Sequence, residues 1–324
     1  MAALQLPHRP DPTTDPRPAH PARNVGLALG LVGMTLVGIA TVANFAAAAG
    51  LDTDPAGAEG ILAWTGGLTT LGLGSVKFGI ALILVAIIHH LWLRVESVGV
   101  SLARLRPVAD TGVEVDGEIE TEHGRATISR DPPEPLGLHQ MARTMWAPML
   151  GMGVMILAAG FVVSLFQQAE TVGTETFRQL GAWKDGLEFL GEGFLLSGIS
   201  FLLGTILYGL RTGGGEVQAR LGLPVHTLEM PATVKAFVGL MMLGLMAAIA
   251  QFVLFVYMAA SVADDPASFA SWAAWVAPLR FVALGIILAG ITLALVSIAK
   301  VLGFQFSRIR DIVTGPRAQE VATS

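Results

Sequence analysis

Long apolar segments alternate with shorter polar segments along the whole chain. Six apolar segments exceed 20 residues, the length at which a helix rising 1.5 Å per residue crosses a hydrocarbon core of about 30 Å. None of the six shows the polar–apolar alternation at every second position that a membrane β-strand would show. The pattern therefore predicts six transmembrane helices, over residues 25–49, 68–94, 144–167, 187–210, 234–261 and 274–302.

Composition supports this fold class. The chain is 53% hydrophobic and only 14% charged, whereas a soluble protein carries about 25% charged residues. In lipid, every backbone N–H and C=O group must be paired within the protein, which favours helices. We therefore predict an all-α polytopic membrane protein. The absence of cysteine from the sequence excludes disulfides, thiolate metal sites and cysteine nucleophiles.

The first apolar segment could be mistaken for a signal peptide, because small residues follow it. It is longer than the roughly 7–15 apolar residues of a signal core, so we expect an uncleaved helix. The preceding tail holds six prolines and is expected to be disordered or extended.

Lysine and arginine predict the orientation. Fifteen of them fall in the two tails and the two long connections, and only Arg178 and Lys184 fall in the three opposite loops. By the positive-inside rule, both termini lie in the cytoplasm, and the protein belongs to the inner (cytoplasmic) membrane. The polar connection of residues 107–142 carries a net charge of −6 between Pro107 and Pro135. We expect a solvated acidic loop there, with a small β-hairpin over residues 113–128 as the alternative.

Glycines recur at similar intervals and suggest an internal repeat. The separations from Gly30 to Gly79, from Gly151 to Gly198 and from Gly239 to Gly290 are 49, 47 and 51 residues. We expect three helical hairpins from one plan, each ending in a basic amphipathic stretch along the inner interface (residues 101–106, 217–221 and 306–310). Small residues allow helices to approach closely in lipid. The glycines expected at helix–helix contacts are Gly74, Gly79, Gly193, Gly198, Gly285 and Gly290.

These features divide the chain into six parts. A proline-rich tail comes first, and each helical pair is one unit, with the acidic loop between the first two. The expected boundaries are 1–24, 25–106, 107–142, 143–222, 223–311 and 312–324. The run from Gly213 to Gly215 is expected to be a flexible linker after the fourth helix.

Four charged residues fall inside the predicted spans. Because a charge at the centre of a bilayer costs about 2.5–3.5 kcal/mol or more, such groups should face protein and pair. Similar depths predict two ion pairs, Lys77 with Glu192 and Arg280 with Glu188. They are expected to lock the bundle together. A proton or ion relay, or contact with another subunit, are the alternatives.

Histidine is the only residue type that suggests a cofactor. His89 and His90 lie near the inner end of the second span, and His139 lies just before the third. One of the adjacent pair could ligate a b-type haem together with His139, but interfacial, hydrogen-bonded histidines are the ordinary explanation. We predict no cofactor. No metal spacing, phosphate loop or catalytic triad stands out.

Two functions from different classes fit this sequence. The first is a non-catalytic anchor or scaffold subunit of a larger inner-membrane assembly, such as an electron-transfer complex. Its partners would be the bilayer and other membrane or peripheral subunits, and no basic, aromatic patch indicates nucleic acid. The second is a small transporter or channel using Lys77, Glu188 and Glu192, which a repeat would favour. Pro148 and Pro278 are expected near helix starts, where proline is tolerated. The sequence therefore shows no pair of broken half-helices that would support a transporter or channel. An enzyme with an intramembrane site is less favoured than either.

Overall fold

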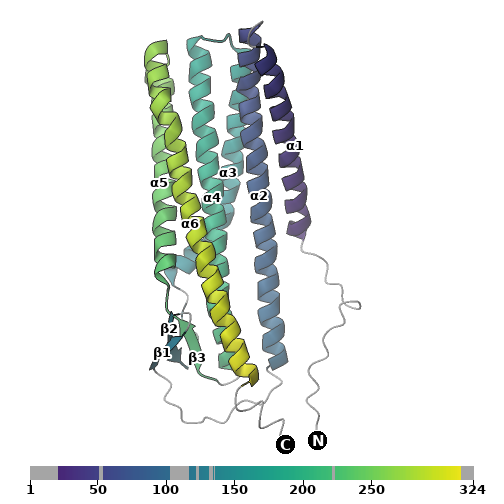
Figure 1. Cartoon of the computed structure of the whole chain (residues 1–324), viewed down its shortest axis with the longest axis vertical. Coiled ribbons are helices and arrows are strands. Elements are labelled where there is room, and N and C mark those ends of the chain that lie inside the picture. Colours follow the sequence, from purple (N-terminus) through teal and green to yellow (C-terminus); the bar gives the residue numbers. More distant parts are fainter. Residues whose placement is uncertain are drawn as a thin grey trace, which may run out of the picture.

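The computed structural model describes residues 21–50, 54–102, 117–121, 124–130, 134, 136–220 and 223–314. Six long helices form an elongated bundle, with a small β-sheet beside one end (Figure 1). Their bounds are α1 Pro21–Gly50, α2 Pro55–Leu102, α3 Gly137–Ala169, α4 Glu175–Arg220, α5 Ala232–Ser261 and α6 Pro266–Thr314. All six are long and apolar enough to cross a membrane, as the hydropathy pattern predicted. The protein is thus a multi-pass, mostly helical membrane protein.

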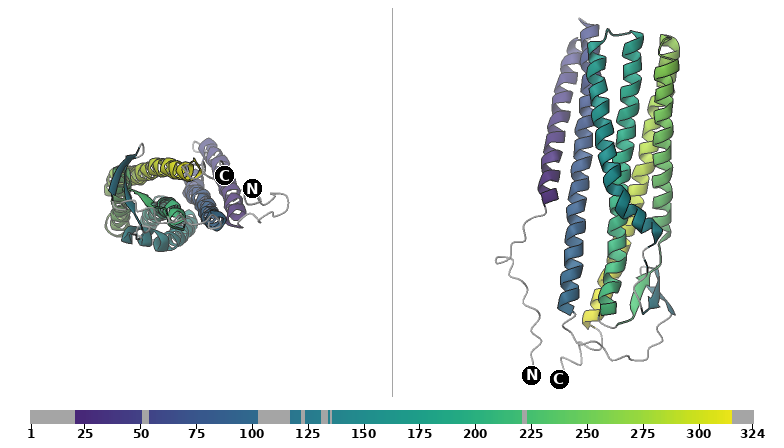
Figure 2. Two further views of the ribbon diagram at one scale, coloured as in Figure 1. Left: turned by 90° about the horizontal axis from the view of Figure 1, so that it is seen from below. Right: turned by 180° about the vertical axis from the view of Figure 1, so that it is seen from behind.

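The even-numbered helices are longer than the odd-numbered ones. Helices α2, α4 and α6 contain 48, 46 and 49 residues, against 30, 33 and 30 for α1, α3 and α5. At 1.5 Å per residue, 48 residues extend about 72 Å, more than twice a hydrocarbon core of roughly 30 Å. We call the end with the sheet the sheet end, and the opposite end, where α3 joins α4 and α5 joins α6, the loop end (Figures 1 and 2).

The even-numbered helices begin at well-defined caps. Asp54 and Asp265 precede Pro55 and Pro266, and Thr174 precedes α4. Their side chains accept hydrogen bonds from backbone N–H groups of the first turn, at 3.1 Å from Gly57 to Asp54, 3.1 Å from Ala267 to Asp265 and 3.2 Å from Phe177 to Thr174. Proline at the first helical position has no N–H to leave unpaired. These caps fix where each long helix starts at the loop end.

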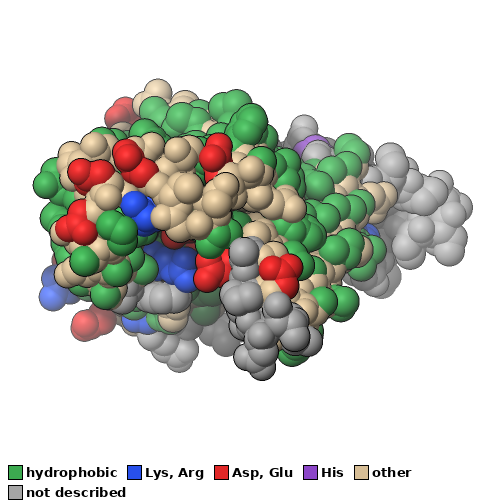
Figure 3. Space-filling view, turned by 90° about the horizontal axis from the view of Figure 1, so that it is seen from above, with side chains coloured by type: hydrophobic (Ala, Val, Ile, Leu, Met, Phe, Trp, Pro, Cys, Tyr) green, Lys and Arg blue, Asp and Glu red, His purple; other side chains and the backbone are tan. Residues whose placement is uncertain are grey.

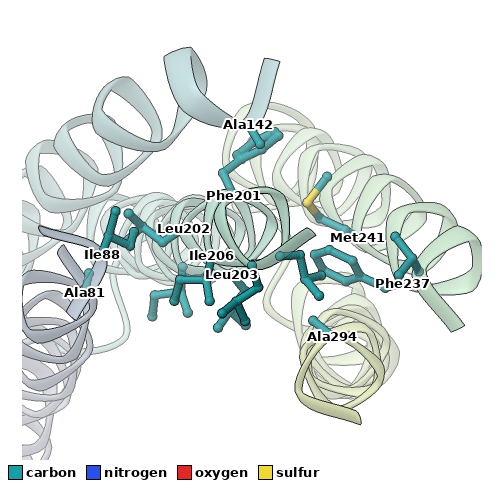
Figure 4. Close-up of a cluster of buried hydrophobic side chains, with 14 of the residues drawn as sticks. Ala81, Ile88, Ala142, Phe201, Leu202, Leu203, Ile206, Phe237, Met241 and Ala294 are labelled. Atoms are coloured by element: carbon teal, nitrogen blue, oxygen red, sulfur yellow. The ribbon is translucent and has the colours of Figure 1, made fainter. Parts of the chain in front are cut away.

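Helix α4 is the centre of the bundle. Within its most apolar stretch 78% of residues are buried, compared with 17% in α1. It packs against α2, α3, α5 and α6 and against the sheet, whereas among the described elements α1 packs only against α2. Figure 4 shows α2, α3, α5 and α6 contributing apolar side chains around α4, and the labelled residues from α4 are Phe201, Leu202, Leu203 and Ile206.

Each odd-numbered helix crosses the helix that follows it at two close contacts. In the first pair, a Cβ added to Gly26 would lie 2.6 Å from the carbonyl oxygen of Gly79, and a Cβ on Gly33 would overlap that of Gly72. Such backbone approaches tolerate only glycine, and they give van der Waals packing where lipid offers no hydrophobic drive.

The other two pairs cross at matching intervals. Gly198 lies against Leu150 and Gly191 against Leu157 in the second pair. In the third, Gly290 lies against Phe237, and Gly244 lies against Ala283 and Ile287. In chain order, the crossing contacts are Gly26–Gly79 and Gly33–Gly72, Leu150–Gly198 and Leu157–Gly191, and Phe237–Gly290 and Gly244–Ala283.

The segment between α2 and α3 contains a β-hairpin, so the expectation of a plain acidic loop is wrong. Strands β1 (Gly117–Thr121) and β2 (Gly124–Ser129) pair in antiparallel fashion, and β2 pairs with β3 (Val225–Leu228) from the α4–α5 connection. The third strand supplies the support that an isolated hairpin lacks. Residues 103–116 of the same connection, including most of the expected basic stretch at 101–106, lie outside the described residues.

Two other local expectations are wrong at the sheet end. The stretches 217–221 and 306–310 were expected along the membrane surface, but their described residues continue α4 and α6 as helix. The glycine run after the fourth span is likewise helical. A Cβ on Gly215 would lie 3.0 Å from the side chain of Val225, so a residue without a side chain allows β3 to approach the helix.

The prolines also differ from expectation. Pro148 lies within α3, which starts at Gly137, and Pro278 lies within α6, which starts at Pro266. Helices α3 and α6 therefore each contain an interior proline, where one backbone hydrogen bond is missing.

Candidate functional site

A cluster of polar side chains lies between α2, α3 and α4, toward the loop end of the spans. It comprises Thr70 and Lys77 of α2, Ser164 of α3, and Lys184, Glu188 and Glu192 of α4. We call this set the intramembrane polar cluster. Glu188 and Glu192 stand on one face of α4 because they are four residues apart.

The ion pair between Lys77 and Glu192 is present. Nζ of Lys77 lies 2.6 Å from Oε1 of Glu192, and the two side chains are 23% and 15% exposed. A charge-assisted bond of this length links α2 directly to α4. The pair thus neutralises two charges that would otherwise be costly in lipid.

Glu188 has a different environment. Its side chain is 8% exposed, and its Oε2 lies 2.9 Å from the hydroxyl of Thr70. The ion pair predicted between Glu188 and Arg280 does not form between these two described side chains, because Thr70 occupies one carboxyl oxygen and the other has no hydrogen-bond partner. Arg280 is exposed, and its positive charge acts on the neighbouring cation Lys184.

Gly67 makes room for this arrangement. A Cβ at Gly67 would overlap Oγ of Ser164 and would lie 3.4 Å from Oε1 of Glu188. Ser164 is fully buried and donates a 2.6 Å hydrogen bond to the carbonyl of Phe161 in its own helix. Glu188 and Ser164 therefore converge on the part of α2 that lacks a side chain.

Lys184 completes the polar cluster on the loop side. The sequence placed it in an outer loop, but it lies within α4, with its Nζ 3.2 Å from Oδ1 of Asp185. Its side chain is 13% exposed, and its ammonium lies beside Gly66 of α2. Thr70 and Ser164 were not identified from the sequence, because Ser and Thr occur throughout such spans without marking a site. Lys184 was not identified because it was expected in a loop.

Five of the six glycines expected at helix contacts are found there. Gly79, Gly198 and Gly290 each face the preceding helix, Gly74 faces Leu157 and Leu195, and Gly193 faces Ala248 of α5. Gly285 is the exception, since a Cβ there would meet no atom of the described residues within 4 Å. It lies on the outer surface of α6.

A second polar centre, the sheet-end junction, was not expected. Arg308 of α6 is 2% exposed and donates to the carbonyl oxygens of His226 in β3, at 2.5 Å, and Arg211 in α4, at 3.4 Å. Its guanidinium also lies over the ring of Phe304, 4.5 Å from the centroid. Burial lowers the pKa of Arg308 to about 10, which still leaves it charged at neutral pH.

Further hydrogen bonds hold β3 in this junction. Gln218 of α4 accepts a 3.0 Å bond from the N–H of His226, and Arg211 donates a 3.3 Å bond to the carbonyl of Leu228. The expected interfacial arginines of α6 thus include one that is buried and joins α4, α6 and the sheet. The sequence did not indicate this role, because Arg308 resembled any other basic residue of an amphipathic stretch.

The histidines do not form a ligand set in the described structure. The side chain of His89 is exposed, and that of His90 lies outside the described side chains. His139 is buried and its ring lies 4.9 Å from that of Tyr208 in α4. Among the described residues, no three His, Cys, Asp or Glu side chains are grouped closely enough to hold a metal ion.

Comparison of the chain with known protein families, with curated proteins and with solved structures found no match. The class of protein therefore follows from the fold itself: a multi-pass helical membrane protein with an intramembrane polar cluster.

Proposed function

We propose that this chain is a non-catalytic scaffold subunit of a larger assembly in the cytoplasmic membrane. The observation that carries the proposal is the Lys77–Glu192 ion pair, in which two charges of the spans neutralise each other at 2.6 Å and link α2 to α4. A paired charge contributes to holding helices together and is not available to bind a passing solute.

The outer face of α1 is the surface that would meet a partner subunit. Helix α1 packs only against α2 among the described elements. Leu31, Val42 and Phe45 on its other side are 72%, 70% and 73% exposed.

We infer that the sheet end faces the cytoplasm. The basic residues of the connections and of the terminal segments support this orientation, since such residues are retained on the cytoplasmic side. Seen from the loop end, the molecule shows more acidic than basic side chains, among apolar and other groups (Figure 3). The chain contains no cysteine, so single cysteines can test this orientation. Glu170→Cys should react with an impermeant thiol reagent added to intact cells, and Glu118→Cys should react only after lysis.

We also infer that the three consecutive helix pairs are hairpins of a common repeat. In the first two pairs the two crossings are seven residues apart on both helices, and in the third they are seven residues apart on α5, where Gly244 lies against both Ala283 and Ile287 of α6. The cap of each even-numbered helix, Asp54, Thr174 or Asp265, precedes the equivalent glycine by 24 or 25 residues. Near the loop end an amide side chain of each odd-numbered helix bonds to its partner helix: Asn44 to Thr65, Gln167 to Phe177 and Gln251 to Val276.

A small transporter is the second candidate, because internal repeats often build transport pathways and because prolines lie within the spans of α3 and α6. One experiment separates the two functions. Extraction in a mild detergent followed by native mass spectrometry should yield the chain with one or more different subunits. If the chain is recovered alone, and reconstituted vesicles show an ion flux that Glu192→Gln abolishes in a folded protein, the scaffold proposal is wrong.

A further inference from the structure

Thr70 has two oxygen neighbours and only one proton to donate. Its hydroxyl oxygen lies 2.9 Å from Oε2 of Glu188 and 3.2 Å from the carbonyl oxygen of Gly66. A hydroxyl donates one hydrogen bond and can accept others. If Glu188 were ionised, Thr70 could donate to only one of these oxygens, and its contact with the Gly66 carbonyl, which also accepts a backbone N–H within α2, would not be a hydrogen bond. If Glu188 carried a proton on Oε2, both contacts would be hydrogen bonds, from Glu188 to Thr70 and from Thr70 to Gly66.

The surroundings of the other carboxyl oxygen, Oε1, also favour a protonated Glu188. Oε1 is buried and has no hydrogen-bond partner among the described residues. A buried carboxylate oxygen without a donor is strongly unfavourable, whereas the carbonyl oxygen of a neutral acid is much less so. Ser164, the polar group opposite it across Gly67, uses its proton on Phe161.

The nearby cations have other partners. Lys77 lies 2.6 Å from Glu192, and Lys184 lies 3.2 Å from Asp185. Among the described side chains no cation is within ion-pair distance of Glu188, although Lys184, Asp185 and Glu192 act on it electrostatically. From the other packed helices, α3 presents the uncharged Ser164 and α5 presents Ala248 and Phe255 to α4, while Arg280 of α6 acts on Lys184.

We propose that Glu188 is a proton-binding site inside the membrane, held neutral by the chain Glu188–Thr70–Gly66. The site goes beyond the scaffold role and does not depend on it. Its occupant is a single proton on Oε2. When this proton is lost to water, the hydroxyl of Thr70 turns from Gly66 to Oε2, and Lys184 is the cation whose charge acts on the new carboxylate.

Infrared spectroscopy of the protein in lipid nanodiscs at pH 7 tests this directly. Exposed carboxyl groups are ionised at that pH, so the C=O stretch of a protonated carboxylic acid reports a buried one. The band should be present in the wild type, absent from Glu188→Gln and retained in Glu192→Gln, the matched control one helical turn further along. Absence of the band from the wild type, or its persistence in Glu188→Gln, overturns the proposal.

Thermal unfolding provides a second, independent test. Glutamine has the shape of the neutral acid and can still donate to Thr70, so Glu188→Gln should unfold at the wild-type temperature. If Glu188 were ionised, the same substitution would remove one of the two negative charges that act on Lys184, leaving only that of Asp185, and would lower the midpoint. The wild-type midpoint should also be the same in sodium and in choline chloride. A sodium-dependent rise that Glu188→Gln abolishes would identify a metal cation as the occupant and overturn the proton assignment.

Discussion

The ammonium of Lys77 in α2 lies 2.6 Å from a carboxylate oxygen of Glu192 in α4, although 114 residues separate the two along the chain. This contact joins the first helix pair to the central helix. Among the described elements α1 packs only against α2. The Lys77–Glu192 contact therefore also helps to link α1, through α2, to the rest of the bundle.

Removing one partner of this pair should cost more than removing both. Glu192→Gln leaves Lys77 without its counter-charge, and we expect a loss of about 1–3 kcal/mol, less than the ~3–5 kcal/mol of a fully buried pair because both groups are partly exposed. The double variant Lys77→Met/Glu192→Gln should recover part of this loss. Thermal unfolding in the same detergent can compare the wild type, the two single variants and the double variant. If the losses of stability in the single variants simply add in the double variant, the two residues are not coupled.

Arg308 should determine how firmly the sheet is attached. Arg308→Met keeps the length of the side chain but removes the hydrogen bonds to His226 and Arg211. Hydrogen bonds from a charged group contribute about 1.5–3 kcal/mol, so amide exchange in β3 should accelerate roughly ten- to hundredfold if local opening dominates. Lys300→Met, which removes an exposed cation from the same helix, is the control and should leave exchange in β3 unchanged.

The crossing of α1 and α2 should not tolerate a larger side chain. Gly33→Leu would drive the two backbones apart, at a cost of about 1–3 kcal/mol for overpacking. Gly30→Leu, on the same helix but with no atom within 4 Å of an added Cβ, should be neutral.

Cross-linking can measure this effect on α1 alone. The side chains of Asn44 and Thr65 are in contact across the two helices, and the chain contains no cysteine. A disulfide between Asn44→Cys and Thr65→Cys should form readily in the otherwise unchanged protein and with Gly30→Leu, and poorly with Gly33→Leu. Equal cross-linking in all three would mean that the glycine contact does not position α1.

Much of this architecture follows from the sequence because lipid imposes simple rules. Long apolar segments must be helical, so the six spans could be predicted. The partner of Lys77 could be predicted because a charge inside the membrane requires a counter-charge at similar depth, and Glu192 satisfied that condition. Gly79 and Gly198 were recognisable as contact residues because only small residues allow two helices to approach closely in lipid.

Contacts that depend on distant, ordinary residues could not be predicted in this way. Strand β3 is four residues long, and its pairing with β2 is a long-range contact that no local pattern indicates. Arg280 was paired with Glu188 on depth alone, but the contact that Glu188 makes is between its Oε2 and the hydroxyl of Thr70. The burial of Arg308 depends on the docked sheet, which the sequence did not identify.

Acidification should loosen the start of α6. Hydrogen bonds from Ser268 and from the N–H of Ala267 lower the pKa of Asp265 below its ordinary value. A depressed pKa means that the stabilisation is present above the unfolded value of about 3.8 and is lost as the pH falls through the folded value. Amide exchange at Ala267 and Ser268, corrected for the intrinsic pH dependence, should therefore be faster at pH 3 than at pH 6, and Asp265→Ala should remove this difference.

Two adjacent glycines of α2 should respond oppositely to the same substitution. Alanine is favoured over glycine in a helix by about 1 kcal/mol at either position. At Gly66 the new methyl group would meet only the flexible end of Lys184, at 3.6 Å, so Gly66→Ala should be neutral or stabilising. At Gly67 it would overlap the hydroxyl of Ser164, and overpacking of about 1–3 kcal/mol should outweigh the gain. Ser164→Gly should restore stability to Gly67→Ala by vacating that space, as thermal unfolding can show. If Gly66→Ala and Gly67→Ala have the same effect, the close approach of α2 and α3 beside Glu188 does not exist in the membrane.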